Sequence, residues 1–167
     1  MVNEMTIDEV IDQYGAEVWR LVFSYVRDEQ LADDLTQEIF IKVFHKLDTF
    51  AGQSSLLTWI WRIAANHCKD YLKSWYKRKV FTRDESTFNY MVSSTSVEKE
   101  IIQSEEDREL ETAVMNLPLK YREIIYLYYY EELPIKEIAQ LLNVKENTVK
   151  TRLRRAKQLI KKRLVNP

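Results

Sequence analysis

The stretch LPIKEIAQLLNVKENTVKTRLRRAKQLIKKRL, residues 133–164, decides the fold of the C-terminal part of this chain. It contains two sets of apolar residues at helical spacing, so each set forms one stripe along a helix. The sets are Ile135, Ile138, Ala139 and Leu142, then Val149, Leu153, Ala156 and Ile160. Asn143 lies between them, and Asn tolerates the left-handed conformation of a sharp turn. The stretch therefore predicts a helix-turn-helix.

The face opposite the second stripe is polar and basic. From Lys150 to Arg163 the chain contains eight Lys or Arg and no acid. On a helix in the major groove, central side chains reach base edges and flanking cations reach phosphates. The predicted DNA-contacting residues are Asn147, Thr148, Lys150, Thr151, Arg152, Arg154 and Arg155. A solvated basic face on a structural helix is the alternative, which the preceding helix and turn in register disfavour.

Composition limits the class of protein. A chain of 167 residues forms one domain or two small ones, and 2 Gly with 3 Pro argue against an all-β fold rich in tight turns. No apolar run has the length of a membrane-spanning helix, and the polar N-terminus does not resemble a signal peptide. A single cysteine excludes an intramolecular disulfide and fits a reducing cytoplasm.

The formal net charge of −1 conceals a strong segregation of charge. Residues 28–38 contain five acids and no base, whereas residues 69–83 and 145–163 are strongly basic. Overall neutrality therefore does not argue against nucleic-acid binding, because contact surfaces are local. The adjacent His67 and Cys68 diverge on a helix, so they make a poor metal pair, and we expect neither a metal nor another cofactor.

The pattern along the chain predicts an all-α protein with two small helical domains. The first domain, residues 1–77, contains three expected helices: one from the capping-box pair Thr6 and Glu9 to about Arg27, one from Asp28 to about Leu47, and one from Ser55 to about Lys77. Residues 78–103 lack periodicity and are interpreted as a flexible linker. The second domain, residues 104–167, begins with expected helices at 104–116 and 119–130, and its tyrosine run 126–130 is interpreted as core and rim.

Two surfaces of the first domain carry candidate functional groups. The second helix exposes Asp33, Asp34, Gln37 and Glu38, which fit either a favourable helix dipole or a protein-docking surface. The third helix carries Arg62, Asn66, Lys69 and Lys73 on one side. Cations for phosphates and an amide for unstacked bases suit single-stranded DNA. Trp59 lies close by, either as a core residue or as a stacking platform.

These motifs together resemble the extracytoplasmic-function (ECF) group of the sigma-70 family of bacterial RNA polymerase sigma factors. DDLTQEIFIKVF (residues 33–44) resembles the region 2 helix that docks on the polymerase clamp, and FAGQSSLLTWIWRIAANHCKDYLK (residues 50–73) resembles the promoter-melting loop and helix. Residues 117–160 resemble region 4. Pro134 and Lys145 depart from the family, which often has a Ser cap at both positions, and Asn147 stands where Gly is frequent.

The resemblance implies binding and strand separation without covalent catalysis, so we expect no enzyme. Asp34, Gln37 and Glu38 would bind core RNA polymerase, whose clamp and flap regions are the implied partners. Phe50, Arg62, Asn66, Lys69 and Lys73 would open the −10 element of promoter DNA, and the basic helix would read the −35 element. An anti-sigma factor, often membrane-bound in this group, is a further implied partner of a cytoplasmic protein.

Two other function classes remain at this point. A stand-alone helix-turn-helix regulator explains residues 133–164 equally well, but it leaves the acidic helix and the Asn66 helix unexplained. A nucleic-acid-processing enzyme is disfavoured because the sequence shows no acid–base cluster, metal cluster or phosphate-binding Gly loop.

Overall fold

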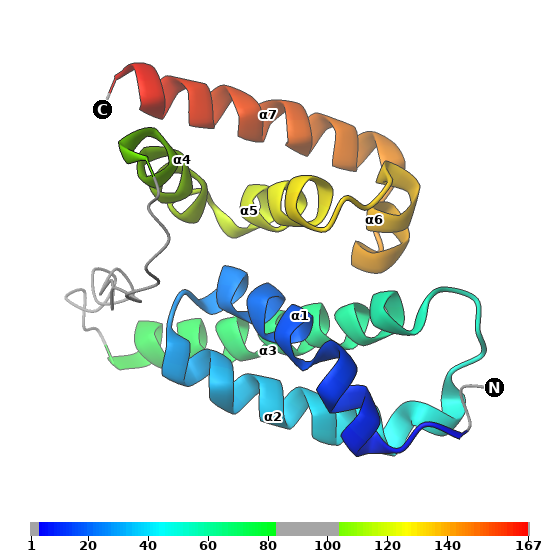
Figure 1. The fold of residues 1–167 in the computed structure, drawn as a ribbon. Coiled ribbons are helices and arrows are strands. Elements are labelled where there is room, and N and C mark those ends of the chain that lie inside the picture. The colour runs from blue at the N-terminus through cyan, green and yellow to red at the C-terminus, as the bar shows by residue number, and fades with distance from the viewer. Residues whose placement is uncertain (1–3, 83–103, 167) are drawn as a thin grey trace. The chain divides into compact units, whose positions relative to one another are not determined.

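In the computed structural model, residues 4–82 and 104–166 are described, and these residues form helices and connecting turns without a strand. The chain divides into two compact units, Met1–Thr95 and Ser96–Pro167 (Figure 1). The all-α prediction is therefore confirmed for the described residues. The expected linker lies outside them, except for its first five residues, 78–82.

Unit 1 contains α1 (Ile7–Val26), α2 (Glu29–Lys46), the short 3-10 turn η2 (Leu47–Thr49) and α3 (Leu56–Thr82). Each long helix begins where the sequence supplies a cap. Thr6 and Glu9 form a capping box, and the Asp28 carboxylate accepts a hydrogen bond from the Leu31 amide at 2.9 Å. The Ser55 hydroxyl accepts one from the Thr58 amide at 3.1 Å. These bonds satisfy backbone donors that the first turn leaves unpaired.

The three long helices of unit 1 pack against one another. The core includes Val18 and Leu21 of α1, Leu35 and Ile39 of α2, and Leu56, Ile60 and Ala64 of α3.

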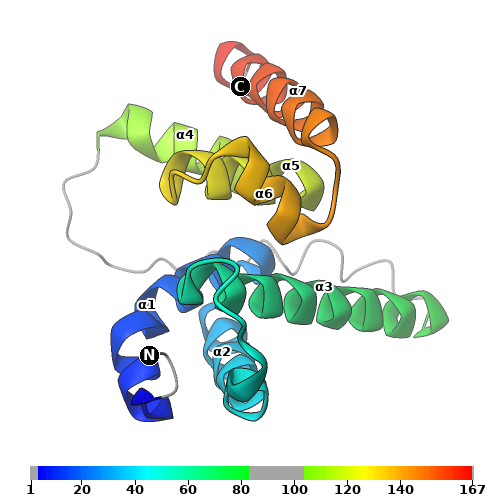
Figure 2. The same cartoon turned by 90° about the vertical axis from the view of Figure 1, so that its right-hand side faces the viewer.

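The third helix is longer than expected. We predicted an end near Lys77, but α3 continues to Thr82. Its C-terminal turns project beyond α1 and α2 (Figure 2). The ammonium of Lys79 lies 5.5 Å from the centroid of the Trp75 ring, one turn earlier. Local contacts of this kind extend a helix past the apolar periodicity on which our boundary was based.

Unit 2 contains α4 (Glu105–Met115), α5 (Leu119–Ile125), the π-helical turn η5 (Tyr126–Tyr130), α6 (Ile135–Leu142) and α7 (Glu146–Val165). The expected helix 119–130 thus consists of an α-helix followed by a π-helical turn, and the π geometry makes the last turn wider. The tyrosines of this run were predicted to form core and rim, and the structure places none of them in the fully buried core. Leu127 is fully buried, whereas Tyr126 and Tyr128 are half-buried and Tyr129 and Tyr130 are exposed.

The helix-turn-helix has the predicted geometry. Asn143 ends α6 in the left-handed conformation at φ 54° and ψ 48°, and the Val144 amide donates to the Ala139 carbonyl at 3.0 Å. This pattern closes a helix and redirects the chain. Pro134 and Lys145 precede α6 and α7 without a side-chain cap, as expected for residues that lack an acceptor.

Candidate nucleic-acid interface

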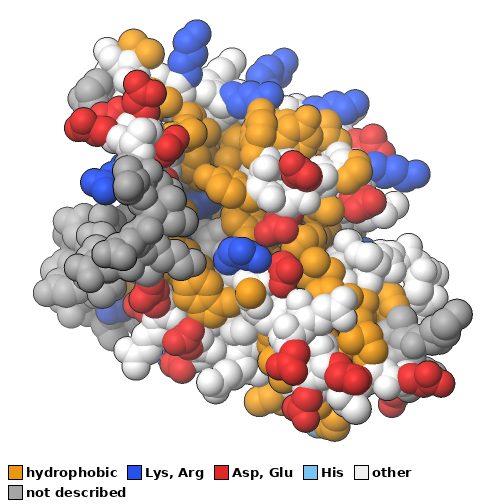
Figure 3. All heavy atoms as spheres, in the orientation of Figure 1, with side chains coloured by type: hydrophobic (Ala, Val, Ile, Leu, Met, Phe, Trp, Pro, Cys, Tyr) orange, Lys and Arg blue, Asp and Glu red, His pale blue; other side chains and the backbone are white. Residues whose placement is uncertain are grey.

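The buried stripe of α7 fixes which side chains the helix exposes. Val149, Leu153 and Ala156 are buried against the rest of unit 2, and Ile160 is half-buried. The predicted DNA-contacting residues consequently lie outside: Asn147, Lys150, Thr151, Arg154 and Arg155 are exposed, and Thr148 and Arg152 are half-buried. Lys and Arg side chains follow α7 along the upper edge of the view in Figure 3. The arrangement agrees with a helix that presents one face to a polyanion.

A groove of about 710 Å³ runs along this face of α7. The side chains that line it are Lys120 and Tyr121 from α5, and Asn147, Thr148, Thr151, Arg152, Arg154, Arg155 and Gln158 from α7. Lys120 lies with its ammonium 5.0 Å from the centroid of the Tyr121 ring. The sequence analysis did not include Lys120 or Tyr121. They come from a different helix, and no periodicity links them to α7.

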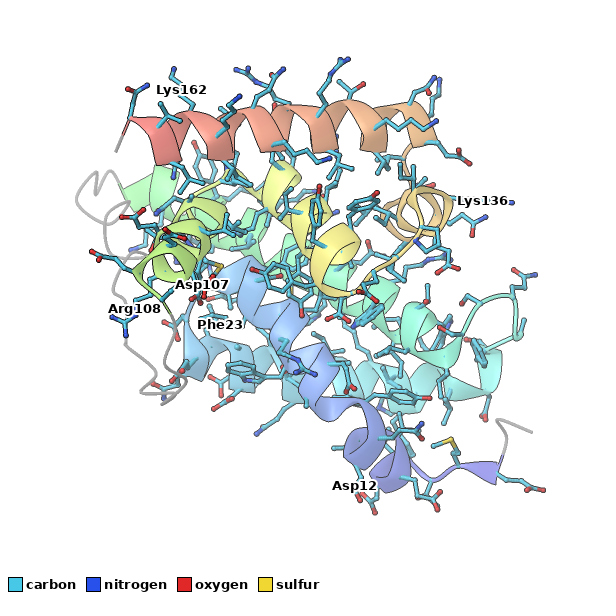
Figure 4. All side chains as sticks on the ribbon, turned by 45° about the horizontal axis from the view of Figure 1, so that its top comes forward. Asp12, Phe23, Asp107, Arg108, Lys136 and Lys162 are labelled. Carbon is cyan, nitrogen blue, oxygen red and sulfur yellow. The ribbon has the colours of Figure 1, made fainter. Side chains whose placement is uncertain are left out.

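The basic side chains of α7 differ in the hydrogen bonds and ring contacts that they make. The Arg155 guanidinium donates to the Gln158 side-chain oxygen at 3.3 Å, so Arg155 lies along the helix surface. Lys157 instead lies 5.5 Å from the centroid of the Tyr129 ring, and a hydrogen bond to Tyr129 raises the pKa of its ammonium. Lys162 projects from the C-terminal part of α7 (Figure 4).

Unit 2 has a second, apolar groove on another side of α7. It has a volume of about 620 Å³ and is lined by Leu110, Val114, Ile125, Tyr129, Tyr130, Lys157, Ile160, Lys161, Leu164 and Val165. The Tyr130 side chain is 58% exposed, but partial burial raises the pKa of its phenol, and the Glu111 carboxylate raises it further. Exposed apolar side chains gathered in a groove are typical of protein-binding surfaces.

The exposed face of α2 contains the predicted docking residues. Asp34, Gln37 and Glu38 are all exposed, and the Glu38 carboxylate accepts a hydrogen bond from the ring Nε2 of His67 on α3 at 2.7 Å. Sequence reasoning missed Ile41 and Phe44, which are 58% and 57% exposed on the same helix. Spacing was a usable signal, because residues three or four apart share a helix face: Ile41 lies four residues after Gln37, and Phe44 lies three residues after Ile41.

The melting loop and α3 form the last candidate surface. Arg62, Asn66 and Lys73 are exposed and Lys69 is half-buried, so the predicted side of α3 faces outward. The ring centroids of Phe50 and Trp59 lie 5.4 Å apart, and the angle between the ring planes is 57°. Both are half-buried, so the contact joins the loop to the start of α3 while leaving part of each ring accessible.

Among residues 4–82 and 104–166, no group of three or more His, Cys, Asp or Glu side chains is placed to hold a metal ion. Within the same ranges, no helix combines the length and the apolar character needed to cross a membrane.

Comparison with known proteins assigns both units to one family. Residues 10–78 match the model of sigma-70 region 2, and residues 107–160 match the model of sigma-70 region 4. The chain is 34% identical over 161 residues to the ECF RNA polymerase sigma factor SigM of Bacillus subtilis, with 94% of each chain covered. It is 31% identical over 165 residues to the ECF RNA polymerase sigma-E factor of Escherichia coli, covering 95% of this chain and 86% of that protein.

A solved structure has the same fold. The sigma factor RpoE, in complex with the anti-sigma factor NepR from Bartonella quintana, matches with a TM-score of 0.76 at 20% identity, covering 95% of this chain and 96% of that one. The fold of both units thus agrees with the family models.

Proposed function

This chain belongs to the extracytoplasmic-function group of the sigma-70 family, and from that membership we propose how its two units divide the work of initiating transcription. It is a sigma factor that directs promoter-specific initiation by RNA polymerase. In this proposal residues 1–77 bind core polymerase and open the −10 element, residues 104–167 read the −35 element, and residues 78–103 connect them. The match to region 2 beside region 4 supports this function over that of a stand-alone helix-turn-helix regulator.

The docking surface for core polymerase is the exposed side of α2. Asp34, Gln37 and Glu38 supply acceptors there, and the exposed apolar side chains of Ile41 and Phe44 extend the same surface. An interface of this composition has an apolar patch beside polar groups that fix orientation. Because α2 resembles the family's clamp-docking helix, we assign the polymerase clamp to this surface. We assign the polymerase flap to the apolar groove of unit 2, because an exposed apolar groove is typical of a protein-binding surface.

The −10 element is opened by the loop and exposed side of α3. Arg62, Lys69 and Lys73 are suited to hold the phosphates of a separated strand, and the amide of Asn66 can hydrogen-bond an unstacked base. Phe50 and its neighbour Trp59 offer aromatic faces at the loop. Their mutual contact keeps the loop in place before DNA arrives.

The −35 element is read as duplex by α7. Asn147, Thr151 and Arg154 lie at the centre of the exposed face, within the basic groove. Arg and Asn side chains can make two hydrogen bonds to one base edge, which distinguishes base pairs in the major groove. Lys120 borders the groove from α5 and is suited to a phosphate contact. The groove between α5 and α7 is the single observation that most supports duplex reading.

The remaining assignments follow from family membership. We propose a cytoplasmic protein that acts by binding and strand separation rather than by covalent catalysis. An anti-sigma factor is its proposed regulator, since the structural relative RpoE is seen in complex with the anti-sigma factor NepR.

Reconstituted transcription tests the proposed function. Purified protein is mixed with Bacillus subtilis core RNA polymerase and genomic DNA fragments, and transcript 5′ ends are sequenced. The expected result is a set of defined start sites, preceded by shared −35 and −10 sequences, that core polymerase alone does not produce. A variant carrying Gln37→Ala and Glu38→Lys serves as control: it should bind −35 duplex and fail to initiate. DNA binding without any protein-dependent start site would favour a regulator instead.

A further inference from the structure

The side chain of Glu38 is held from a second helix. Its Oε2 lies 2.7 Å from Nε2 of His67, although the two residues are 29 positions apart in the sequence. Glu38 belongs to α2 and His67 to α3, and these helices pack against each other along unit 1 (Figure 1). An ionised carboxylate only accepts hydrogen bonds, so Nε2 carries the proton in this contact.

His67 and Glu38 differ in the exposed fraction of their side chains. The His67 side chain is 14% exposed, whereas that of Glu38 is 57% exposed. His67 is therefore packed between the helices, and Glu38 extends outward from it. A carboxylate has about four acceptor sites on its two oxygens, so one bond at Oε2 leaves Oε1 able to accept from a partner.

The neighbours of His67 on α3 connect this contact to DNA. Asn66 is exposed and belongs to the surface assigned to the −10 element, while Cys68 is buried in the core. Successive residues of one helical turn thus face DNA, the docking carboxylate and the core. The residue that contacts the Glu38 carboxylate is therefore the sequence neighbour of Asn66 on α3, whereas Glu38 itself belongs to α2.

We propose that His67 is a positioning residue for polymerase docking: it holds the Glu38 carboxylate in the conformation that binds core RNA polymerase. The proposal rests on the docking function assigned to Glu38 above. A free glutamate samples several rotamers and loses this freedom on binding. In this chain the histidine has already restricted the carboxylate, so less freedom remains to be lost when polymerase binds.

The proposal predicts a specific pattern of substitutions at position 67. Gln and Met have similar size and similar helix propensity, but only Gln offers an N–H donor to Glu38. Immobilising one flexible side chain changes affinity by roughly threefold to tenfold. His67→Met is therefore expected to weaken binding to core polymerase by about fivefold, and His67→Gln to retain most of the affinity. His67→Ala provides a second variant without a donor.

The experiment is a fluorescence-anisotropy titration of the labelled full-length chain with Bacillus subtilis core RNA polymerase. The matched control is Tyr126→Phe in unit 2, which removes another hydrogen bond to a carboxylate: the Tyr126 hydroxyl donates to the Glu131 side chain at 2.8 Å. Thermal unfolding of every variant measures the purely structural effect. We expect Tyr126→Phe to bind like the original chain, although it lacks a bond of similar length.

A double-mutant cycle shows whether His67 acts through Glu38. In a Glu38→Ala background, His67→Met is expected to have no further effect on affinity, because the group that it positions is gone. The proposal would be overturned if His67→Met reduced the affinity for core polymerase equally in the original chain and in the Glu38→Ala background. It would also be overturned if His67→Met bound more tightly than the original chain, or if the Met and Gln variants bound equally well. If Glu38→Ala itself binds core polymerase normally, the docking assignment fails and this proposal fails with it. If Glu38→Ala binds core polymerase more weakly but His67→Met binds it normally, only the positioning role of His67 is overturned.

Discussion

The ring centroids of Phe50 and Trp59 lie 5.4 Å apart, and the two ring planes are tilted by 57°. Phe50 follows η2 and Trp59 lies in the first turn of α3, so the contact bridges the base of the loop between them. Gly52, inside this loop, has a φ of 70°, a backbone conformation that favours glycine. The aromatic pair therefore gives the loop a defined position at one end.

Removal of this aromatic contact is expected to make promoter opening less favourable. An aromatic pair contributes about 0.5–1.5 kcal/mol, so Phe50→Ala should reduce the amount of open complex by roughly threefold to tenfold. Phe50→Tyr keeps the ring and serves as the matched control. Fluorescence of 2-aminopurine placed in the −10 element measures opening. An unchanged signal for Phe50→Ala would show that the pair does not prepare the loop for DNA.

Asn66→Ala separates strand opening from duplex reading. Asn66 is exposed on α3, in the unit that does not contain the helix-turn-helix. We expect the variant to bind −35 duplex normally and to leave fewer thymines of the −10 element reactive to permanganate, because it cannot make a hydrogen bond to an unstacked base. Normal permanganate reactivity would remove Asn66 from the assigned surface.

Two groups of cations on α7 are expected to behave differently. Arg154→Ala should relax preference at one or two −35 positions by about 1–3 kcal/mol, the value of a good bidentate base contact. Lys161 and Lys162 lie in the exposed C-terminal turns, where phosphates are the expected contact, although Lys161 also borders the apolar groove. Their joint replacement by Ala should weaken all sequences alike. It should also reduce the slope of log affinity against log salt by about one for each phosphate that is no longer neutralised.

Competition binding to a library of −35 variants at several salt concentrations measures both effects. Replacement of Lys136, an exposed lysine on α6 outside the groove, is the control and should change neither quantity. If Arg154→Ala weakens every −35 sequence equally, Arg154 contacts the backbone and our assignment is wrong.

Arg122 is expected to be a stability residue rather than a DNA contact. It is 7% exposed, and its guanidinium donates to the carbonyls of Met115 and Leu117, both at 3.1 Å. Hydrogen bonds to a charged group are worth about 1.5–3 kcal/mol. Arg122→Met should therefore lower the free energy of unfolding of unit 2 by about 2 kcal/mol or more in urea denaturation. Arg108→Met, at an exposed site on α4, should have little effect.

Cys68 is expected to be inert in the folded protein. Its side chain is fully buried, and burial raises the pKa of the thiol from 9.0 to about 12. At pH 8 the group stays a protonated thiol, and the thiolate is the reactive form. Iodoacetamide should label native Cys68 only as fast as the unit opens, and label the urea-unfolded chain rapidly.

The same pKa shift has a consequence for stability. Because the folded thiol holds its proton more tightly than the unfolded one, its contribution is complete below pH 9.0 and decreases as the pH rises toward 12. Cys68→Ala should remove this part of the alkaline dependence, which pH-dependent urea denaturation can detect. Fast labelling of the native chain at pH 8 would contradict the burial on which both expectations rest.

Local sequence determined the helices, their caps and the turn of the helix-turn-helix. The side chains of Thr6, Asp28 and Ser55 each accept a hydrogen bond from the backbone amide three residues later. The left-handed conformation of Asn143 involves the backbone of that single residue. Such interactions depend only on neighbours in the chain. Helical periodicity likewise predicted which side of α7 is exposed, because a buried stripe leaves only the opposite face for solvent.

Tertiary structure alone decided which residues from different helices meet. His67 contacts Glu38 across 29 positions, Trp19 contacts Asp33 across 14, and Lys120 reaches the groove of α7 from α5. No periodicity within one helix carries this information, because it depends on the crossing and rotation of two helices. The tyrosine run shows the same limit: Leu127 is buried whereas Tyr129 and Tyr130 are exposed, and the apolar content of the run did not distinguish them.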